Sequence, residues 1–279
     1  MTAQGNGTQL FLGDSEHSDI ELPQGIVCVR SLRSPTKETP NEDAAVVVPI
    51  GRKAVVIAVA DGVGGTPAGR EAAITAVRNL AKKLAQKEDE TDQLRPAILD
   101  AVEDSNRQIL ALGRGAATTL VIAEIVTRRL RSYHVGDSEL VSVGQRGRVK
   151  WRVVPHSPTG FAVEAGLLDE NEAVQHDQRH ILFNVIGAQD MRVEIGTAVR
   201  LADRDTVLLA TDGLLDNLFF DEIVEIMRIG PLPVAADRLV DQARKRMSNN
   251  GGDKPSKPDD LTVILYRPNP PKRQRKKKN

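Results

Sequence analysis

Residues 54–73 read AVVIAVADGVGGTPAGREAA. The first seven form an uninterrupted apolar run rich in β-branched side chains, which is typical of a strand buried on both faces. The run ends at Asp61, and three glycines in the next four positions let the backbone turn tightly and approach a ligand closely. Apolar residues then recur at helical spacing from Ala72 to Leu84. The stretch predicts a carboxylate at the end of a buried strand, beside free backbone carbonyls, which is what a hard divalent cation binds.

An Asp-Gly pair alone is more often a plain turn than a ligand site. Two later stretches strengthen the ligand hypothesis. Residues 206–210 (TVLLA) form a second buried-strand pattern that runs into Asp212, and Asp259 and Asp260 precede a third strand pattern at 261–266. Acidic clusters at the ends of three buried strands can converge at one edge of a sheet core. The residues themselves predict an α+β fold with a carboxylate site at that edge.

With these residues the chain resembles the PPM-type, or type 2C, metal-dependent protein serine/threonine phosphatases of the bacterial type. The matching motifs follow the family's order over about residues 27 to 267. They are Asn41-Glu42-Asp43-Ala44, Ala60-Asp61-Gly62-Val63-Gly64-Gly65, Ala117-Thr118-Thr119-Leu120, Val135-Gly136-Asp137-Ser138, Ala210-Thr211-Asp212-Gly213-Leu214-Leu215-Asp216 and Asp259-Asp260-Leu261-Thr262-Val263. The resemblance implies a four-layer α-β-β-α sandwich, in which helix pairs flank two central, mostly antiparallel sheets.

The resemblance also implies the chemistry. A hydroxide bridging two Mn²⁺ or Mg²⁺ ions would attack phosphoserine or phosphothreonine directly, with no covalent intermediate. Asp61, Asp212 and Asp259 would be the catalytic carboxylates. Asp61 would bridge the ions, the Gly62 carbonyl would complete one shell, and Asp212 and Asp259 would bind the other ion. A third, weaker ion would be held by Asp137 together with Asp212.

The phosphate-binding and outer-shell residues come from the same comparison. Asp43 and Glu42 match residues of the metal site's outer shell. Many family members place an arginine that grips the phosphate about five residues before the Asp43 position, where this chain has Glu38. The nearest cation, Lys37, and with a longer loop Arg33, are therefore the phosphate-binding candidates.

Two more positions depart from the family pattern. Glu139 stands where arginine is usual, and we expect its charge to help retain a cation at Asp137, in what looks like a hairpin turn. Val63 stands where some members have a histidine acting as general acid, although bacterial-type members also lack it. Two alternatives stay open: a catalytically weak or inactive phosphatase-like binding or regulatory module, and a hydrolase of small phosphoesters.

The remaining patterns define the organisation of the chain. We expect a flexible lead-in at 1–24, a catalytic domain at 25–267 and a basic, disordered tail at 268–279. Within the domain, helices are predicted at 93–112, 221–227 (capped by Asp221) and 232–247. An antiparallel meander is expected at 118–154 and a strand at 193–199. At about 156–185 the resemblance implies a mobile flap that would influence substrate choice. His176 and His180 could share a helix face there, but hard-metal sites do not need imidazole.

Composition sets the remaining expectations. Of 279 residues, 40% are hydrophobic and 3% aromatic, so the core must be mainly aliphatic. The single cysteine, Cys28, forms no internal disulfide and reads as a buried strand residue in a reducing compartment. No apolar run is long enough for a membrane helix and no leader precedes the domain, which favours a cytoplasmic monomer. The expected partner is a phosphorylated protein, a Ser/Thr kinase or its targets. The six basic residues at 272–278 allow a non-specific anionic contact or a plain solvated end.

Overall fold

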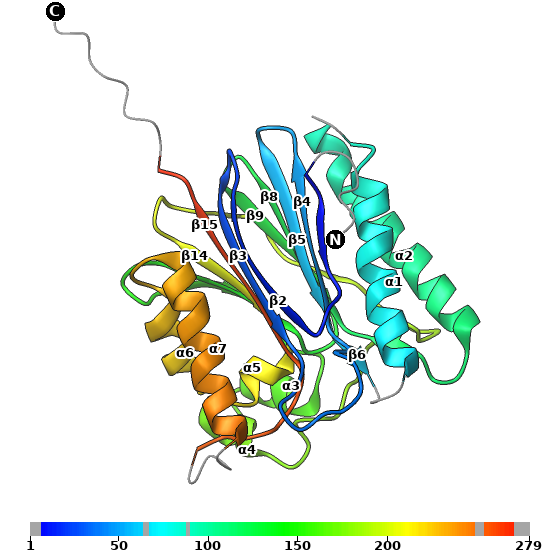
Figure 1. The fold of residues 1–279 in the computed structure, drawn as a ribbon, viewed down its shortest axis with the longest axis vertical. Coiled ribbons are helices and arrows are strands. Elements are labelled where there is room, and N and C mark those ends of the chain that lie inside the picture. The colour runs from blue at the N-terminus through cyan, green and yellow to red at the C-terminus, as the bar shows by residue number, and fades with distance from the viewer. Residues whose placement is uncertain (1–6, 64–66, 88–89, 249–253, 271–279) are drawn as a thin grey trace, which may run out of the picture.

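The computed structural model describes residues 7–63, 67–87, 90–248 and 254–270. Two large antiparallel sheets lie face to face and a pair of helices covers each outer face, so the four-layer arrangement is confirmed (Figure 1). The first sheet has the order β1-β4-β5-β8-β9-β12, with β13 also on β9, and the second has the order β11-β10-β14-β15-β3-β2.

The first sheet and its helices come largely from the N-terminal half. Its strands are β1 (Gln9–Phe11), β4 (Ala44–Ile50), β5 (Ala54–Ala60), β8 (Leu120–Val126), β9 (Arg129–Val135), β12 (Glu194–Ile195) and β13 (Val199–Arg200). Helices α1 (Pro67–Leu84) and α2 (Leu94–Leu112) pack on its outer face, and a 3-10 turn, Thr91–Gln93, precedes α2. A small separate pair joins β6 (Gly62–Val63) to β7 (Ala117–Thr118).

The second sheet combines both ends of the chain. Its strands are β2 (Ser15–Glu21), β3 (Gly25–Leu32), β10 (Glu139–Val143), β11 (Val149–Arg152), β14 (Thr206–Ala210) and β15 (Leu261–Pro268). Helices α6 (Phe220–Met227) and α7 (Leu232–Ser248) cover its outer face. Three short helices, α3 (Pro158–Glu164), α4 (Glu170–Gln175) and α5 (Asp212–Leu215), lie toward the lower end of the sandwich in Figure 1.

The β5 pattern is explained by burial on both faces. Val55, Ile57 and Val59 belong to the core between the sheets, whereas Val56 and Ala58 belong to the core under α1 and α2. Alanines on the helix-facing side let the helices approach the sheet closely. Cys28 is buried and free in β3, as expected. No helix of the described chain is long and apolar enough to cross a membrane.

The expectation of a flexible lead-in at 1–24 was wrong for the residues that the structure describes. Residues 9–11 form β1 on β4, and residues 15–21 form β2 along β3. β2 reads as polar because it is an edge strand, so most of its side chains stay partly exposed. Residues 1–6 lie outside the described part. The tail also begins later than predicted, since Pro268 pairs with Gly25 and the Asn269 N–H donates to the Gln24 carbonyl; residues 271–279 are not described.

Three local predictions were also wrong. The expected meander is divided, because β9 lies in the first sheet and β10 in the second, so Gly136-Asp137-Ser138 crosses between sheets instead of closing a hairpin. The expected strand at 193–199 is two short strands, β12 and β13, both paired with β9. Helix α6 starts at Phe220, and the Phe219 N–H at its start is bound by Glu222, not by Asp221. Strand alternation does not reveal which sheet a strand joins, and a cap depends on the local chain direction.

Candidate functional site

A cleft of about 470 Å³ opens at one end of the sandwich, between the ends of the two sheets. The strand registers place its acidic residues there. Ala60, just before Asp61, pairs with Ala44 at the start of β4, and Ala210, just before the Thr211-Asp212 pair, lies beside Val263 and Glu139. Strands that end or begin in adjacent register bring their flanking loops to the same edge. Residues far apart in sequence therefore meet in this cleft.

The backbone of Asp61 is held by the Thr118-Thr119 pair. The Asp61 N–H donates to Thr119 Oγ1 at 3.1 Å, and the Asp61 carbonyl accepts from Thr118 Oγ1 at 2.7 Å and from the Thr119 N–H at 2.8 Å. Gly62 follows with no room for a side chain, since a Cβ there would lie 2.5 Å from the carbonyl of Gly69 in α1. This packing explains the glycine after Asp61 and fixes the direction in which the carboxylate leaves the strand.

Asp212 is the first residue of α5, immediately after β14. The preceding Thr211 donates from Oγ1 to Asp43 Oδ2 at 2.8 Å, and its N–H donates to the Thr262 carbonyl. Asp43 Oδ1 is buried and has no hydrogen-bond partner within the described chain. Thr211 thus joins the loop of Asp212 to Asp43, and one oxygen of Asp43 stays available to a further ligand or water.

Asp137 lies in the crossover between the sheets, and His156 holds the backbone before it. The His156 N–H donates to the Gly136 carbonyl at 3.0 Å, while the Gly136 N–H donates to His156 Nδ1 at 3.1 Å. Gly136 has φ of 101°, a conformation that favours glycine. Ser138 Oγ contacts Thr119 Oγ1 at 2.7 Å, which connects Asp137 to the Asp61 strand. Our expectation of a hairpin turn at Asp137 was therefore wrong.

A second group near this crossover has ligand-like spacing. Side-chain atoms of His134, His156 and Glu194 lie within 4.8 Å of one another. However, His156 Nδ1 accepts the Gly136 N–H, so the neutral ring carries its proton on Nε2, which contacts Glu194 Oε2 at 3.3 Å. Nε2 is then a donor without a free lone pair. The hydrogen bonds of this group favour positioning of the crossover over metal binding.

Lys257 occupies the centre of the acidic cluster, a position that the sequence did not reveal. Its Nζ lies 2.6 Å from Asp212 Oδ2, 2.9 Å from Asp216 Oδ2 and 3.2 Å from Asp259 Oδ2. Burial lowers the pKa of Lys257, but the surrounding carboxylates outweigh it and leave the pKa well above its ordinary value. The ammonium is therefore an internal counter-ion for three carboxylates, two of which the sequence assigned to metal binding.

The two predicted phosphate-binding residues lie in different places relative to the cleft. Lys37 lines the cleft, but its Nζ contacts both Glu42 Oε2 at 2.5 Å and Asp260 Oδ2 at 2.6 Å. Asp260, which the sequence analysis did not single out as a site residue, also accepts the N–H of Glu42 at 2.8 Å. Arg33 is not among the residues that line the cleft, and its guanidinium lies 3.7 Å from Asp14. Lys37 is therefore in place but neutralised, and Arg33 faces elsewhere.

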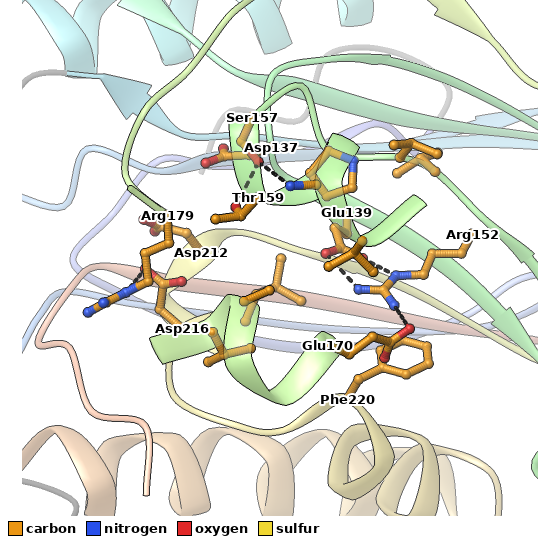
Figure 2. Close-up of a pocket in the computed structure, with 18 of the residues that line it drawn as sticks. Asp137, Glu139, Arg152, Ser157, Thr159, Glu170, Arg179, Asp212, Asp216 and Phe220 are labelled. Atoms are coloured by element: carbon orange, nitrogen blue, oxygen red, sulfur yellow. Dashed lines mark hydrogen bonds and ion pairs between the residues drawn. The ribbon is translucent and has the colours of Figure 1, made fainter. Parts of the chain in front are cut away.

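The expectation for Glu139 was also wrong. Its carboxylate accepts two hydrogen bonds from Arg152, at 2.7 and 3.1 Å, and the Arg152 guanidinium stacks 3.9 Å from the centre of the Phe220 ring (Figure 2). A bidentate ion pair neutralises the charge that we expected to help retain a cation at Asp137.

Burial and mutual repulsion raise the pKa values of the cleft carboxylates. Burial, followed by the charge of Asp212, raises the pKa of Asp137 to about 8 and those of Asp216 and Asp259 to about 6. The pKa of Asp61 is also raised well above its usual range, again by burial first and by Asp212 second. These shifts mean that the nearby positive charge is too small to balance the carboxylates when they are all ionised.

The cleft lining shows the same deficit. Among the described residues, its charged members are Glu42, Asp61, Asp137, Asp212, Asp259 and Asp260 against Lys37 and Lys257. With all of them ionised, the cleft carries a formal excess of four negative charges. Carboxylate and carbonyl oxygens are the ligands that hard divalent cations take, so the residues present fit such ions.

Comparisons with known proteins agree with this arrangement. The family model described as "Protein phosphatase 2C" matches residues 34–244. The chain is 31% identical over 219 residues to protein phosphatase PhpP of Streptococcus pneumoniae, covering 75% of this chain and 84% of that protein. The structure of the S. agalactiae serine/threonine phosphatase is 27% identical with a TM-score of 0.73, covering 91% of this chain and 99% of that one. The catalytic domain of the phosphatase PstP in complex with two manganese ions shares the fold at 22% identity, with a TM-score of 0.67 and coverage of 88% and 98%.

Proposed function

Because the chain belongs to the protein phosphatase 2C family of metal-dependent serine/threonine protein phosphatases, we propose that it hydrolyses phosphoserine and phosphothreonine in the cleft formed by Asp61, Asp212 and Asp259. The observation that carries this assignment is the charge of the cleft. Its formal excess of four negative charges equals the charge of two divalent cations. Nothing in a binding module requires such a concentration of buried and half-buried carboxylates.

We assign the ligands as follows. Asp61, the Gly62 carbonyl, Asp212 and Asp259 would hold two ions, with Mn²⁺ or Mg²⁺ as the metal. Asp137 with Asp212 would hold a third ion. When bound, the ions supply an activated water and positive charge for the phosphate oxygens.

The chain's own residues orient this centre. The unpartnered Asp43 Oδ1 and the Glu42 carboxylate, which contacts Lys37, suit the outer shell. The threonine pair fixes the backbone of Asp61, which lines the same cleft as Asp212 and Asp259. A cluster held by backbone hydrogen bonds loses little freedom when it binds its ligands.

Lys257 is the better candidate for a phosphate contact. Lys37 pairs with Glu42 and Asp260, which are not among the proposed ligands of the two ions, so metal binding would leave these ion pairs intact. Divalent ions would instead compete with Lys257 for Asp212 and Asp259. An ammonium released from two carboxylates beside the reacting phosphate can pair with the phosphate instead. We therefore propose Lys257, ahead of Lys37 and Arg33, as the cation that replaces the family's arginine.

The remaining assignments are proposals of the same kind. The substrate is a phosphorylated protein, a Ser/Thr kinase or one of its targets, and the protein acts as a cytoplasmic monomer. The buried, unpaired Cys28 is consistent with a reducing compartment. The basic residues after 271 would make a non-specific contact with an anionic surface.

Hydrolysis of an aryl phosphate and of a phosphothreonine peptide, each with Mn²⁺ and with chelator, tests the proposal. We expect turnover of both substrates with Mn²⁺ and none after chelation. Undiminished turnover after exhaustive chelation and dialysis would refute the metal assignment. Hydrolysis of the aryl phosphate alone would identify a small-phosphoester hydrolase instead.

A further inference from the structure

A second cavity of about 200 Å³ adjoins the catalytic cleft beneath α3 and α4 (Figure 2). Asp137 and Asp212 line both the cleft and this cavity, so the two spaces share a wall. In Figure 2, Arg179 lies beside Asp212 and Asp216, on the opposite side of the view from Arg152. The cavity is therefore a direct neighbour of the space in which the carboxylates lie.

On the far side of the cavity, one arginine pairs with two carboxylates. Arg152 donates from Nε and Nη2 to Glu139 and from Nη1 to Glu170 at 3.0 Å, and its guanidinium stacks on Phe220. Both acids are thereby paired with one arginine that uses three of its donor groups. An acidic substrate group entering here would lose its hydration and find Arg152 already engaged, which is costly.

Most of the remaining lining is apolar and comes from several elements, although Ser157, Thr159 and Glu164 also belong to it. Val163 projects from α3, Val174 from α4, Leu215 from α5 and Ile223 from α6. A cavity of about 150 Å³ lined by aliphatic and aromatic side chains is large enough to bind benzene. A cavity of about 200 Å³ can therefore take one leucine, isoleucine or phenylalanine side chain. Well-packed interiors contain few voids of this size.

We propose that this cavity binds an apolar side chain of the phosphorylated protein, close in sequence to the phosphorylated residue. The proposal rests on the proposed function and adds the chemistry of the sequence that is recognised. An extended chain advances about 3.3–3.6 Å per residue, so a side chain that enters a space adjoining the cleft belongs to a residue only a few positions from the phosphate. The walls from α3 and α4 make the flap the element that selects this side chain.

A peptide series tests the proposal. Each peptide carries phosphothreonine in an alanine background, with a single leucine placed in turn at each position from −3 to +3. We expect one position to raise kcat/KM about 10-fold or more over the all-alanine peptide, the scale of discrimination by a hydrophobic pocket. Aspartate at that position should remove the gain.

Variants that fill the cavity test whether the leucine preference arises there. Val163→Trp and Val174→Phe each fill the cavity from a different helix and should abolish the leucine preference, measured as a kcat/KM ratio within one preparation. Leu167→Trp is the matched control, because Leu167 is in the same flap but 82% exposed, and it should keep the preference. The ratio is unaffected by the fraction of misfolded protein. Equal rates for every leucine position, or a preference that survives both filling variants, would overturn the cavity proposal alone. No hydrolysis of any phosphopeptide would overturn the proposed function as well.

Discussion

Replacing Lys257 with methionine removes one ammonium group and keeps most of the side-chain volume. In the structure this ammonium contacts Asp212, Asp216 and Asp259 at 2.6, 2.9 and 3.2 Å. A divalent ion at Asp212 and Asp259 must displace it. We expect Lys257→Met to bind Mn²⁺ more tightly than the wild-type protein, even though the variant loses the proposed phosphate contact.

The size of the effect follows from the contacts. Hydrogen bonds to charged groups contribute about 1.5–3 kcal/mol each. The displaced ammonium regains hydration and can keep Asp216, so we count the loss of a single contact. At about 1.4 kcal/mol per factor of ten, the Mn²⁺ dissociation constant should fall about 10- to 100-fold.

Without metal the same variant should be less stable. Its carboxylates would have lost their counter-ion, and removing one partner of a fully buried ion pair costs about 3–5 kcal/mol. The Lys257 side chain is 26% exposed, so the loss of unfolding free energy should be smaller than that, about 1–3 kcal/mol by the same scale. Tighter metal binding combined with a lower metal-free melting temperature is the signature of an internal counter-ion.

Calorimetric titration of metal-free protein with Mn²⁺ and thermal unfolding in chelator measure the two effects. Lys150→Met is the matched control, because Lys150 pairs with the buried Asp205 at the other end of β14 from Asp212. The control should lose stability without any change in Mn²⁺ affinity. Unchanged or weaker Mn²⁺ binding by Lys257→Met would refute the competition between the ammonium and the metal.

The remaining predictions concern the carboxylates and the tail. Asp61→Asn and Asp212→Asn should each lower turnover on the order of 10²–10³-fold or more, while metal-free thermal stability holds or rises because repulsion is relieved. Asp137→Ala should lower kcat and raise the Mn²⁺ concentration needed for full rate, with two tight sites left in calorimetric titration. The pKa of Asp137 is raised in the folded state to about 8, so metal-free protein should lose stability as pH rises from about 4 to about 8, and Asp137→Asn should flatten that dependence in thermal unfolding. Deleting 271–279, which spares β15, should leave aryl-phosphate hydrolysis intact and remove salt-sensitive binding to nucleic acid or anionic vesicles.

Each of these four predictions has a result that would contradict it. A near-wild-type rate in either asparagine variant would show that the residue is not a ligand. Loss of the tight sites in Asp137→Ala would make that residue structural to the main pair. An unchanged pH dependence in Asp137→Asn would assign the titration to other carboxylates. Equal anion binding by the truncated and full-length proteins would make the tail a solvated end.

Local pattern was sufficient for the central strands and the long helices. The both-face burial of β5, the stripe of α1 and the position of Asp61 after Ala60 are written in consecutive residues, because strand and helix periods are local properties. β2 was missed for the same reason. Its polar residues carry no strand signal until β3 provides a partner.

The sequence by itself determined that carboxylates stand at the ends of buried strands, and the motifs identified the family to which they belong. The tertiary structure alone decided which charges neutralise them. Lys257 meets Asp212 across 45 positions and Lys37 meets Asp260 across 223, while the neighbouring Glu139 is paired with Arg152. An ion pair forms between groups that folding brings within about 4 Å, and that proximity depends on which strand ends share an edge of the sandwich. The local periodicity of the sequence does not indicate which charged groups become neighbours.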